Sequence, residues 1–212
     1  MKVAGVLKIW GRKNSVNVQK VLWCAAELGL DYERIDAGLE FGLNNEEWFL
    51  ALNPNGRVPL IQDGDFTLWE SNSIVRYLCA THDLGGLYPE LPRQRAAAER
   101  WMDWQLSTLA GPTSIAFRNL VRTPPGKRDA AAVAAAVEEA NSALLMLDRH
   151  LAAHRFAAGD ALSMGDIPVG AVTYRWLALE GIERPAWPSL ERWQRELGLR
   201  EGFRAHVMLP LS

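Results

Sequence analysis

Ser15 and Asn17 are polar residues at a point where the chain changes from loop to helix. The stretch WGRKNSVNVQKVLW begins with residues that do not hold a helix and continues with apolar residues at helical spacing. A helix that begins near Asn17 turns unpaired backbone N–H groups and the positive end of its dipole toward the preceding loop. Either residue can be a simple N-cap, or the pair can stabilise an anion such as a thiolate. Since this junction holds no cysteine, a thiol would have to arrive with a ligand.

Two further stretches place unusual residues at the ends of expected elements. In NPNGRVPLI, Pro59 stands where a strand should begin, although proline cannot donate to a sheet ladder. A trans proline at a sheet edge is the more frequent arrangement, whereas a cis Val58–Pro59 bond would turn the peptide edge of Val58 outward for a ligand. In LWESNS, Glu70 and Ser71 lie at a strand-to-helix junction, which suits the ammonium and carboxylate of an amino acid or a simple helix cap.

The elements that must position these residues can be read from the apolar pattern. Strands are expected at 7–10, at 31–36 and twice within 57–70 around an Asp63–Gly64 turn, with helices at 17–28, within 44–53 and at 71–82. From about Pro92 the chain is helical, with long segments at 93–120, 128–154 and 166–181. The sequence therefore predicts an α/β domain of order βαβαββα at residues 1–84, a linker at 85–91 and an all-α domain at 92–212.

One junction in the helical half has a purely structural interpretation. In LSMGD, Ser163 and Asp166 have the spacing of a capping box, in which each side chain bonds the other residue's backbone. We expect this box to define the start of a helix.

Composition limits the classes of partner. The chain has 212 residues, 49% of them hydrophobic and 23% charged, and a formal net charge of −2. This charge argues against a general nucleic-acid surface, and the apolar runs are shorter than the roughly 20 residues of a membrane span. The start lacks the pattern of a secretion signal, so a cytoplasmic location is expected.

Cysteine and histidine usage predicts no metal site. Cys24 and Cys79 fall inside helical patterns without metal spacing, which favours packed core thiols over a redox pair. His150 and His154 have helical i, i+4 spacing but lack the glutamate of an HExxH motif, which favours solvated helix residues.

Taken together, NPNGRVPLI, ESNSIVRYL and the helical second half give a chain that resembles the glutathione transferase superfamily over nearly its whole length. The closest resemblance is to serine-type bacterial cytosolic members, of theta or nu type. It implies a thioredoxin-like first domain, glutathione as co-substrate, no metal, and a homodimer. It also implies conjugation of glutathione, as a thiolate, to small hydrophobic electrophiles.

The resemblance also implies roles for individual residues. Ser15 corresponds to the hydroxyl that bonds the glutathione sulfur, and Asn17 matches the asparagine of a TPN pattern in one bacterial branch, so either can be the main thiolate donor. Val58, held by cis Pro59, would bind the cysteinyl backbone. The remaining glutathione contacts would come from Glu70 and Ser71 at the γ-glutamyl end and from Arg57 and Asn44 at the glycyl end.

The second substrate is expected between the domains. One helix face carries Trp104, Ser107, Thr108 and Gly111, which can form the cleft wall, although a tryptophan at helical spacing can equally be core. Further candidates are Arg12, Phe117 and Arg118, for which solvated or packing roles are the alternative.

Other functions on the same fold stay open. The similarity of Ser15-Val16-Asn17 to the TPN pattern motivates a second hypothesis, a glutathione-dependent disulfide reductase. A lyase or isomerase of the same fold is also compatible with the sequence. The fold further serves as a non-catalytic binding or scaffold module, whose glutathione site is often degraded. Ser15, Pro59, Glu70 and Ser71 are all present, which favours an enzyme.

Overall fold

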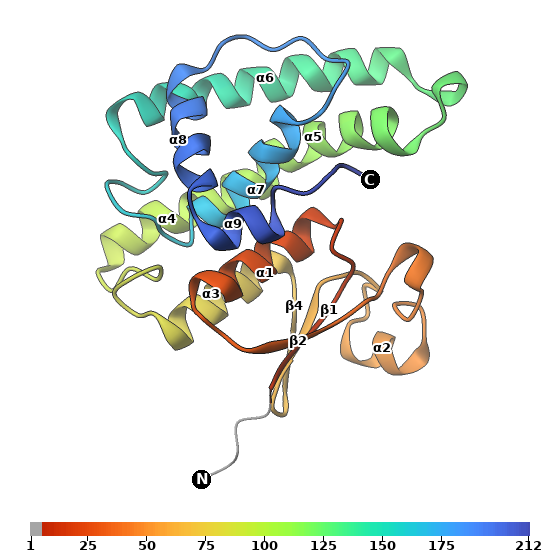
Figure 1. Cartoon of the computed structure of the whole chain (residues 1–212), viewed down its shortest axis with the longest axis vertical. Helices are drawn as coiled ribbons and strands as arrows, with labels where there is room; N and C mark the ends of the chain where they lie inside the picture. The colour runs from red at the N-terminus through yellow and green to blue at the C-terminus, as the bar shows by residue number, and fades with distance from the viewer. Residues whose placement is uncertain (1–5) are drawn as a thin grey trace.

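The computed structural model describes residues 6–212, as a four-stranded sheet beneath a bundle of helices (Figure 1). The strands are β1 (Leu7–Trp10), β2 (Tyr32–Ile35), β3 (Leu60–Asp63) and β4 (Phe66–Trp69), in the spatial order β2-β1-β3-β4. β1 runs parallel to β2 and antiparallel to β3, and β3 forms a hairpin with β4. The predicted βαβαββα order is confirmed.

The hairpin turn lies one residue later than expected. Asp63 still pairs with Phe66, so the turn residues are Gly64 and Asp65 rather than Asp63 and Gly64. Gly64 has a φ of +63°, a value that glycine adopts without strain at the first position of a two-residue hairpin turn.

Helices cover both faces of the sheet because its side chains alternate. Ile9 and Ile61 belong to the main core with α1 (Val16–Glu27) and α3 (Ser71–His82). Trp10 and Leu60 point to the opposite face, where they pack with Phe49 of α2 (Glu47–Leu52). A single 3₁₀ turn, η1 (Leu39–Phe41), precedes α2.

The second half is helical throughout. Its elements are α4 (Pro92–Trp104), η2 (Gln105–Leu109), α5 (Ala110–Phe117), η3 (Arg118–Arg122), η4 (Pro125–Lys127), α6 (Ala130–Ala153), α7 (Asp166–Leu177), α8 (Pro188–Gly198) and α9 (Glu201–His206). The sequence pattern did not separate α8 and α9, which follow the last predicted helix.

The segment expected as one helix at 93–120 contains two π-helical stretches, η2 and η3. Pro112 accounts for the first. It has no N–H to donate to the carbonyl of Thr108, and its ring crowds that carbonyl, so the preceding turn widens. The widened turn holds Gln105, which is buried against the first domain.

Helix α1 lies between the sheet and the bundle (Figure 1), and all residues from Val18 to Ala25 are buried. Two glycines let the bundle approach it closely. A Cβ on Gly170 of α7 would lie 2.7 Å from Leu197 Cδ1 and 3.2 Å from the Trp23 ring. A Cβ on Gly202 of α9 would lie 2.9 Å from Ala26 Cβ. Small residues are therefore needed where α7 and α9 meet α1.

Lys20 is a fully buried cation within this layer. Its Nζ donates to Gln105 Oε1 at 2.8 Å and to Asn72 Oδ1 at 3.4 Å, and the amide of Asn72 donates to the Met102 carbonyl at 2.9 Å. Burial, followed by repulsion from Arg175, lowers the pKa of Lys20 to about 7, although Glu70 raises it. The network joins α1 and α3 to the bundle through neutral partners.

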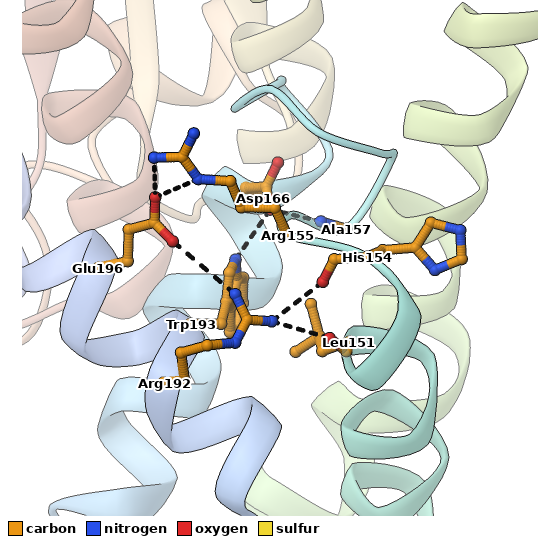
Figure 2. A network of polar contacts seen from close by, with 8 residues as sticks. All are labelled: Leu151, His154, Arg155, Ala157, Asp166, Arg192, Trp193 and Glu196. Carbon is orange, nitrogen blue, oxygen red and sulfur yellow. Dashed lines mark hydrogen bonds and ion pairs between the residues drawn. The ribbon is translucent and has the colours of Figure 1, made fainter.

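Asp166 is the corresponding anion of the bundle (Figure 2). One carboxylate oxygen accepts from the Ala157 N–H at 2.8 Å and from Trp193 Nε1 at 3.0 Å, and the other accepts from the Ser163 N–H at 3.0 Å. Burial raises the pKa of Asp166 to about 6, against the effect of these hydrogen bonds. The carboxylate thus ties the 157–163 loop and α8 to the start of α7.

The predicted capping box is half confirmed. Asp166 accepts from the Ser163 N–H, but the Ser163 hydroxyl accepts from Gly165 at 3.2 Å rather than from Asp166. Regular helix α7 begins only at Asp166.

Helix α6 is the one described helix with the length and apolar composition of a membrane span. Glu138 and Glu139 interrupt its apolar sequence, and α6 packs beside α5 and α8. Its Asp148 accepts from the N–H groups of Ser189 and Leu190 at the start of α8, at 2.9 and 2.8 Å. Its buried residues, among them Ala140, Leu144 and Leu151, belong to the core of the bundle.

Cys24 and Cys79 are both fully buried, as predicted for core thiols. Their sulfurs lie 3.5 Å apart between α1 and α3. The hydrogen bond to Cys79, together with burial, raises the pKa of the Cys24 thiol, which disfavours a reactive thiolate.

The folded pKa of Lys20 predicts a pH dependence of stability. The unfolded chain keeps its lysine proton up to about the ordinary value of 10.5, whereas the folded chain releases it near 7. Between these values the unfolded state binds more protons, so Lys20 makes the fold more stable as pH rises, by at most about 1.4 kcal/mol per pH unit. Urea unfolding of Lys20→Met from pH 7 to 10 should lack this gain. The exposed Lys8→Met is the control, and parallel curves for Lys20→Met and the wild type would contradict the prediction.

Asp166→Asn should lower the free energy of unfolding by about 2–4 kcal/mol at pH 8. The variant keeps one oxygen and turns an NH₂ group toward N–H donors, which leaves buried donors unpaired. Urea unfolding checks this, with the exposed Asp160→Asn as the matched control. A loss equal to that of the control would show that the buried hydrogen bonds contribute little.

Candidate functional site

The predicted site residues gather at one end of the sheet because of the strand register. Trp10, the last residue of β1, pairs with Leu60, the first residue of β3, and Leu60 pairs with Trp69, the last residue of β4. The segments beyond these three residues hold Ser15, the Val58–Pro59 pair and the Glu70–Ser71 pair. Residues far apart in the sequence therefore share one edge.

Ser15 is the N-cap residue of α1, with φ −84° and ψ 120°. Its carbonyl accepts from the Gln19 N–H at 2.9 Å, but its hydroxyl makes no capping hydrogen bond to the helix. Ser15 is 7% exposed, whereas Asn17 is on the exposed side of the first turn. The hydroxyl at the helix mouth is thus available to an external acceptor.

The loop before α1 is held from both halves of the protein. The side chain of Gln19 donates to the Lys13 carbonyl at 3.1 Å, and Arg175 Nη2 of α7 donates to the Asn14 carbonyl at 2.9 Å. At the start of the loop, the N–H of Gly11 donates to the Ile35 carbonyl. A Cβ on Gly11 would lie 2.3 Å from a methyl group of Val18, so only glycine fits there.

The Val58–Pro59 peptide bond is cis, so the ligand-binding alternative applies rather than the more frequent trans proline. In the described part of the chain, the N–H and C=O of Val58 have no hydrogen-bond partner. The loop before them is fixed by Asn53, whose amide donates to the Arg57 carbonyl at 2.7 Å, and by Asn44, whose amide donates to the Gly56 carbonyl at 2.7 Å. The free peptide edge of Val58 can therefore pair with an extended ligand backbone.

Glu70 has a φ of 72° and a ψ of 107°, a conformation that side chains with a Cβ rarely adopt. It is exposed, and no described cation lies within ion-pair distance of it. Ser71 begins α3 and is buried. The strained residue thus presents an unpaired carboxylate beside a helix N-terminus, which suits a ligand with both an ammonium and a carboxylate.

The residues expected to form the second-substrate wall do not all point the same way. Trp104 packs on Trp101, with ring centroids 5.1 Å apart, and lines a cavity of about 370 Å³ with Met146 and His150. Ser107 and Gly111 lie on an open helix face, and Thr108, half-buried, contacts the Ser107 hydroxyl at 3.4 Å.

Phe117 is buried beneath two guanidinium groups. The Cζ of Arg175 lies 4.3 Å from its ring centroid and that of Arg122 lies 4.9 Å away. Arg118 is exposed and donates to the Ser114 hydroxyl, and Arg12 in the loop before Ser15 is half-buried.

Sequence analysis missed Arg122 and Arg175. Arg175 lies inside an apolar helix pattern and Arg122 in a loop-like stretch, so the sequence around each of them does not indicate a binding site. A single arginine in an otherwise apolar helix is the signal that could have found Arg175.

No group of three or more metal-ligating side chains occurs among residues 6–212. The rings of His150 and His154 stack with their centroids 4.2 Å apart. The His150 imidazole bonds the Ala157 carbonyl, and the His154 imidazole bonds the His150 carbonyl. Burial lowers the pKa of His150. Carbonyl bonding gives both histidines a structural role at the end of α6.

Comparison with known proteins agrees with this geometry. The family model described as Glutathione S-transferase, N-terminal domain, matches residues 5–80, and the corresponding C-terminal domain model matches residues 105–198. Glutathione S-transferase GstB of Escherichia coli is 44% identical over 98% of this chain and 100% of that protein. Glutathione S-transferase 3 of Zea mays is 32% identical over 97% of this chain and 95% of its own.

A solved structure is similar at the same level. The theta class glutathione S-transferase from the citrus canker pathogen Xanthomonas axonopodis pv. citri, with glutathione bound, has a TM-score of 0.94 and 45% identity. The match covers 98% of this chain and 99% of that one. By its two matched domains, its full-length relatives and its fold, this chain belongs to the glutathione S-transferase family.

Proposed function

We propose that this enzyme binds glutathione along the sheet edge formed by Ser15, Val58 and Ser71, and transfers it as a thiolate to small electrophiles. The observation that carries the proposal is the pairing of Trp10 with Leu60 and of Leu60 with Trp69. This register brings a helix mouth, a free peptide edge and a second helix N-terminus to one place.

Each part of glutathione has a chemical match at this edge. The cysteinyl backbone pairs with the free N–H and C=O of Val58, held by Pro59. The γ-glutamyl ammonium meets the Glu70 carboxylate, and its carboxylate meets Ser71 at the start of α3. At the glycyl end, the exposed Arg57 meets the carboxylate, while Asn44 acts through its bond to the Gly56 carbonyl.

Thiolate stabilisation follows from the helix mouth. The positive end of the α1 dipole and a hydrogen bond from the Ser15 hydroxyl favour the thiolate over the thiol, which lowers the pKa of the bound sulfur. Ser15 suits this role better than Asn17, because its hydroxyl is free and lies in a buried position at the mouth. Fixed donors and the orientation of the thiolate supply the rate gain.

We further propose that the chain divides into a glutathione-binding domain at 1–84, a linker at 85–91 and a helical domain at 92–212, and that it works as a cytoplasmic homodimer. Membership of the family supports both points. Phe66, on the edge strand β4, is 44% exposed and is a candidate contact between subunits. Trp104, Ser107, Thr108, Gly111, Phe117, Arg118 and Arg12 remain candidates for the electrophile side.

Ser15→Ala should lower kcat/KM for 1-chloro-2,4-dinitrobenzene about 100-fold, since it removes one preorganised donor to the developing charge. It should also abolish the ultraviolet thiolate signal of bound glutathione at pH 7. The unfolding free energy should stay close to that of the wild type, because the hydroxyl makes no capping bond.

Asn17→Ala is the matched comparison and should retain activity within about threefold. Loss of the thiolate signal in Asn17→Ala instead would transfer the role to Asn17. If wild-type protein reduces a model disulfide but conjugates no aryl halide, the transferase proposal is wrong and the reductase alternative is favoured.

Glu70→Gly should separate stability from ligand binding. Glycine adopts the φ of 72° without a Cβ clash, so the free energy of unfolding should rise by up to about 1 kcal/mol. The KM for glutathione should rise as well, because the carboxylate is lost. Glu70→Ala keeps the Cβ and should weaken glutathione binding without the gain in stability. Urea unfolding and steady-state kinetics test both, and a Glu70→Gly protein with unchanged glutathione KM would contradict the proposed contact.

A further inference from the structure

Three arginines converge beside the Ser15 loop from three separate elements. Arg12 lies in the loop after β1, Arg122 ends η3 and Arg175 is on α7. Arg122 and Arg175 share contact with the Phe117 ring. Arg12 lies two residues before Asn14, whose carbonyl accepts from Arg175. Repulsion from Arg12 and Arg122 also lowers the pKa of Arg175.

The cluster lacks a compensating side-chain carboxylate. Among residues 6–212, no Asp or Glu forms an ion pair with any of the three. Burial, followed by repulsion from Arg122 and Arg12, lowers the pKa of Arg175 to about 9. Glu40 of η1 is the one acid that raises the pKa of Arg12 and of Arg122. Its effect on each pKa is smaller than the lowering caused by burial and by a neighbouring arginine. Three mutually repelling cations are thus held together by the fold.

Several donors of the cluster are unused. The Nε atoms of Arg12 and Arg175 are buried and have no hydrogen-bond partner. The described side-chain hydrogen bonds of the cluster are those of Arg175 with the Asn14 carbonyl and of Arg122 with a backbone oxygen of Ser212, the last residue of the sequence, at 3.1 Å. A buried N–H donor without a partner costs stability, so the arrangement is suited to an anion that is bound during function.

The cluster is next to the thiolate position but is separate from the residues assigned to the two ends of glutathione. Arg175 bonds Asn14, the residue immediately before Ser15. The γ-glutamyl end is assigned to Glu70 and Ser71, and the glycyl end to Arg57. An anion at the cluster therefore lies beside the Ser15 loop and does not compete with the residues assigned to the two ends of glutathione.

We propose that Arg12, Arg122 and Arg175 form a subsite for the carboxylate of the electrophilic second substrate. The inference rests on the proposed function and narrows its substrate class. Guanidinium groups bind a carboxylate by paired N–H donors, and the buried Phe117 ring holds those of Arg122 and Arg175 side by side. The thiolate sulfur then attacks the electrophilic carbon, the C–S bond forms, and a halide leaves with the electron pair of the broken bond.

A matched pair of electrophiles tests the subsite. We choose 4-chloro-3,5-dinitrobenzoate and its neutral methyl ester, and divide each kcat/KM by the rate constant of the uncatalysed reaction with glutathione. The wild type should favour the benzoate by at least tenfold on this scale. Arg122→Gln and Arg12→Gln should each lower the corrected kcat/KM for the benzoate about tenfold, with less than a twofold change for the ester and for the KM of glutathione.

Three controls sharpen the result. Arg122→Lys keeps the charge and should restore part of the lost preference. Arg149→Gln removes an exposed arginine of α6 and should change neither substrate. 3,5-Dinitrobenzoate, which has no leaving group, should inhibit competitively against the benzoate electrophile, with a Ki at least fivefold higher in Arg122→Gln.

The outcomes separate this inference from the proposed function. If the wild type conjugates the ester and 1-chloro-2,4-dinitrobenzene but shows no preference for the benzoate, the subsite is wrong and the transferase activity stands. Equal losses for benzoate and ester, or losses confined to the KM of glutathione, would assign the arginines to glutathione and overturn the subsite. If the folded enzyme conjugates none of the three electrophiles, both proposals fail.

Discussion

Burial of helix α1 on all sides is the constraint on which the rest of the structure depends. The helix shares the main core with Ile9 and Ile61 of the sheet and packs on the bundle through Trp23, so its axis is fixed by both halves of the protein. Its first turn is the exception, because Asn17 is exposed there while Ser15, at the helix mouth, is 7% exposed. A helix mouth held this firmly keeps its dipole and its free hydroxyl in one orientation, as electrostatic stabilisation of a thiolate requires.

Local chemistry made much of the fold, and the cis proline at the sheet edge, predictable. Strand alternation, the Gly29 stop and the Val-Pro dipeptide act over a few residues, and the structure follows them to the cis bond at Pro59. Failures came where distant parts of the chain decide. The π-helical turn that begins at Gln105 depends on Pro112, seven residues later in the sequence. Its Gln105 side chain accepts from the buried Lys20 of the first domain. The Arg12, Arg122 and Arg175 cluster joins three elements that no sequence window contains, and helix α8 is capped by Asp148 of α6.

Charges are distributed unevenly between the two ends of the proposed ligand path. Glu70 supplies a negative charge at one helix N-terminus, while the loop before α1 is surrounded by cations. Glutathione in its thiolate form carries more negative than positive charge, so this distribution favours both its orientation and its ionisation. Lys20 belongs to the same field, since Glu70 and Arg175 act on it in opposite directions. The charge around the Ser15 loop therefore depends on residues of both domains.

Arg175 has two contacts whose partners belong to different halves of the chain, the Asn14 carbonyl and the Phe117 ring. A chimaera that joins the first domain of this protein to the helical half of a relative keeps the Ser15 loop in place only if that half also supplies a donor at the position of Arg175. The two halves are therefore not interchangeable modules. Substitutions on the open face around Ser107 and Gly111 leave the Ser15 loop untouched, whereas a change of Arg175 also removes a donor that supports this loop from the second domain.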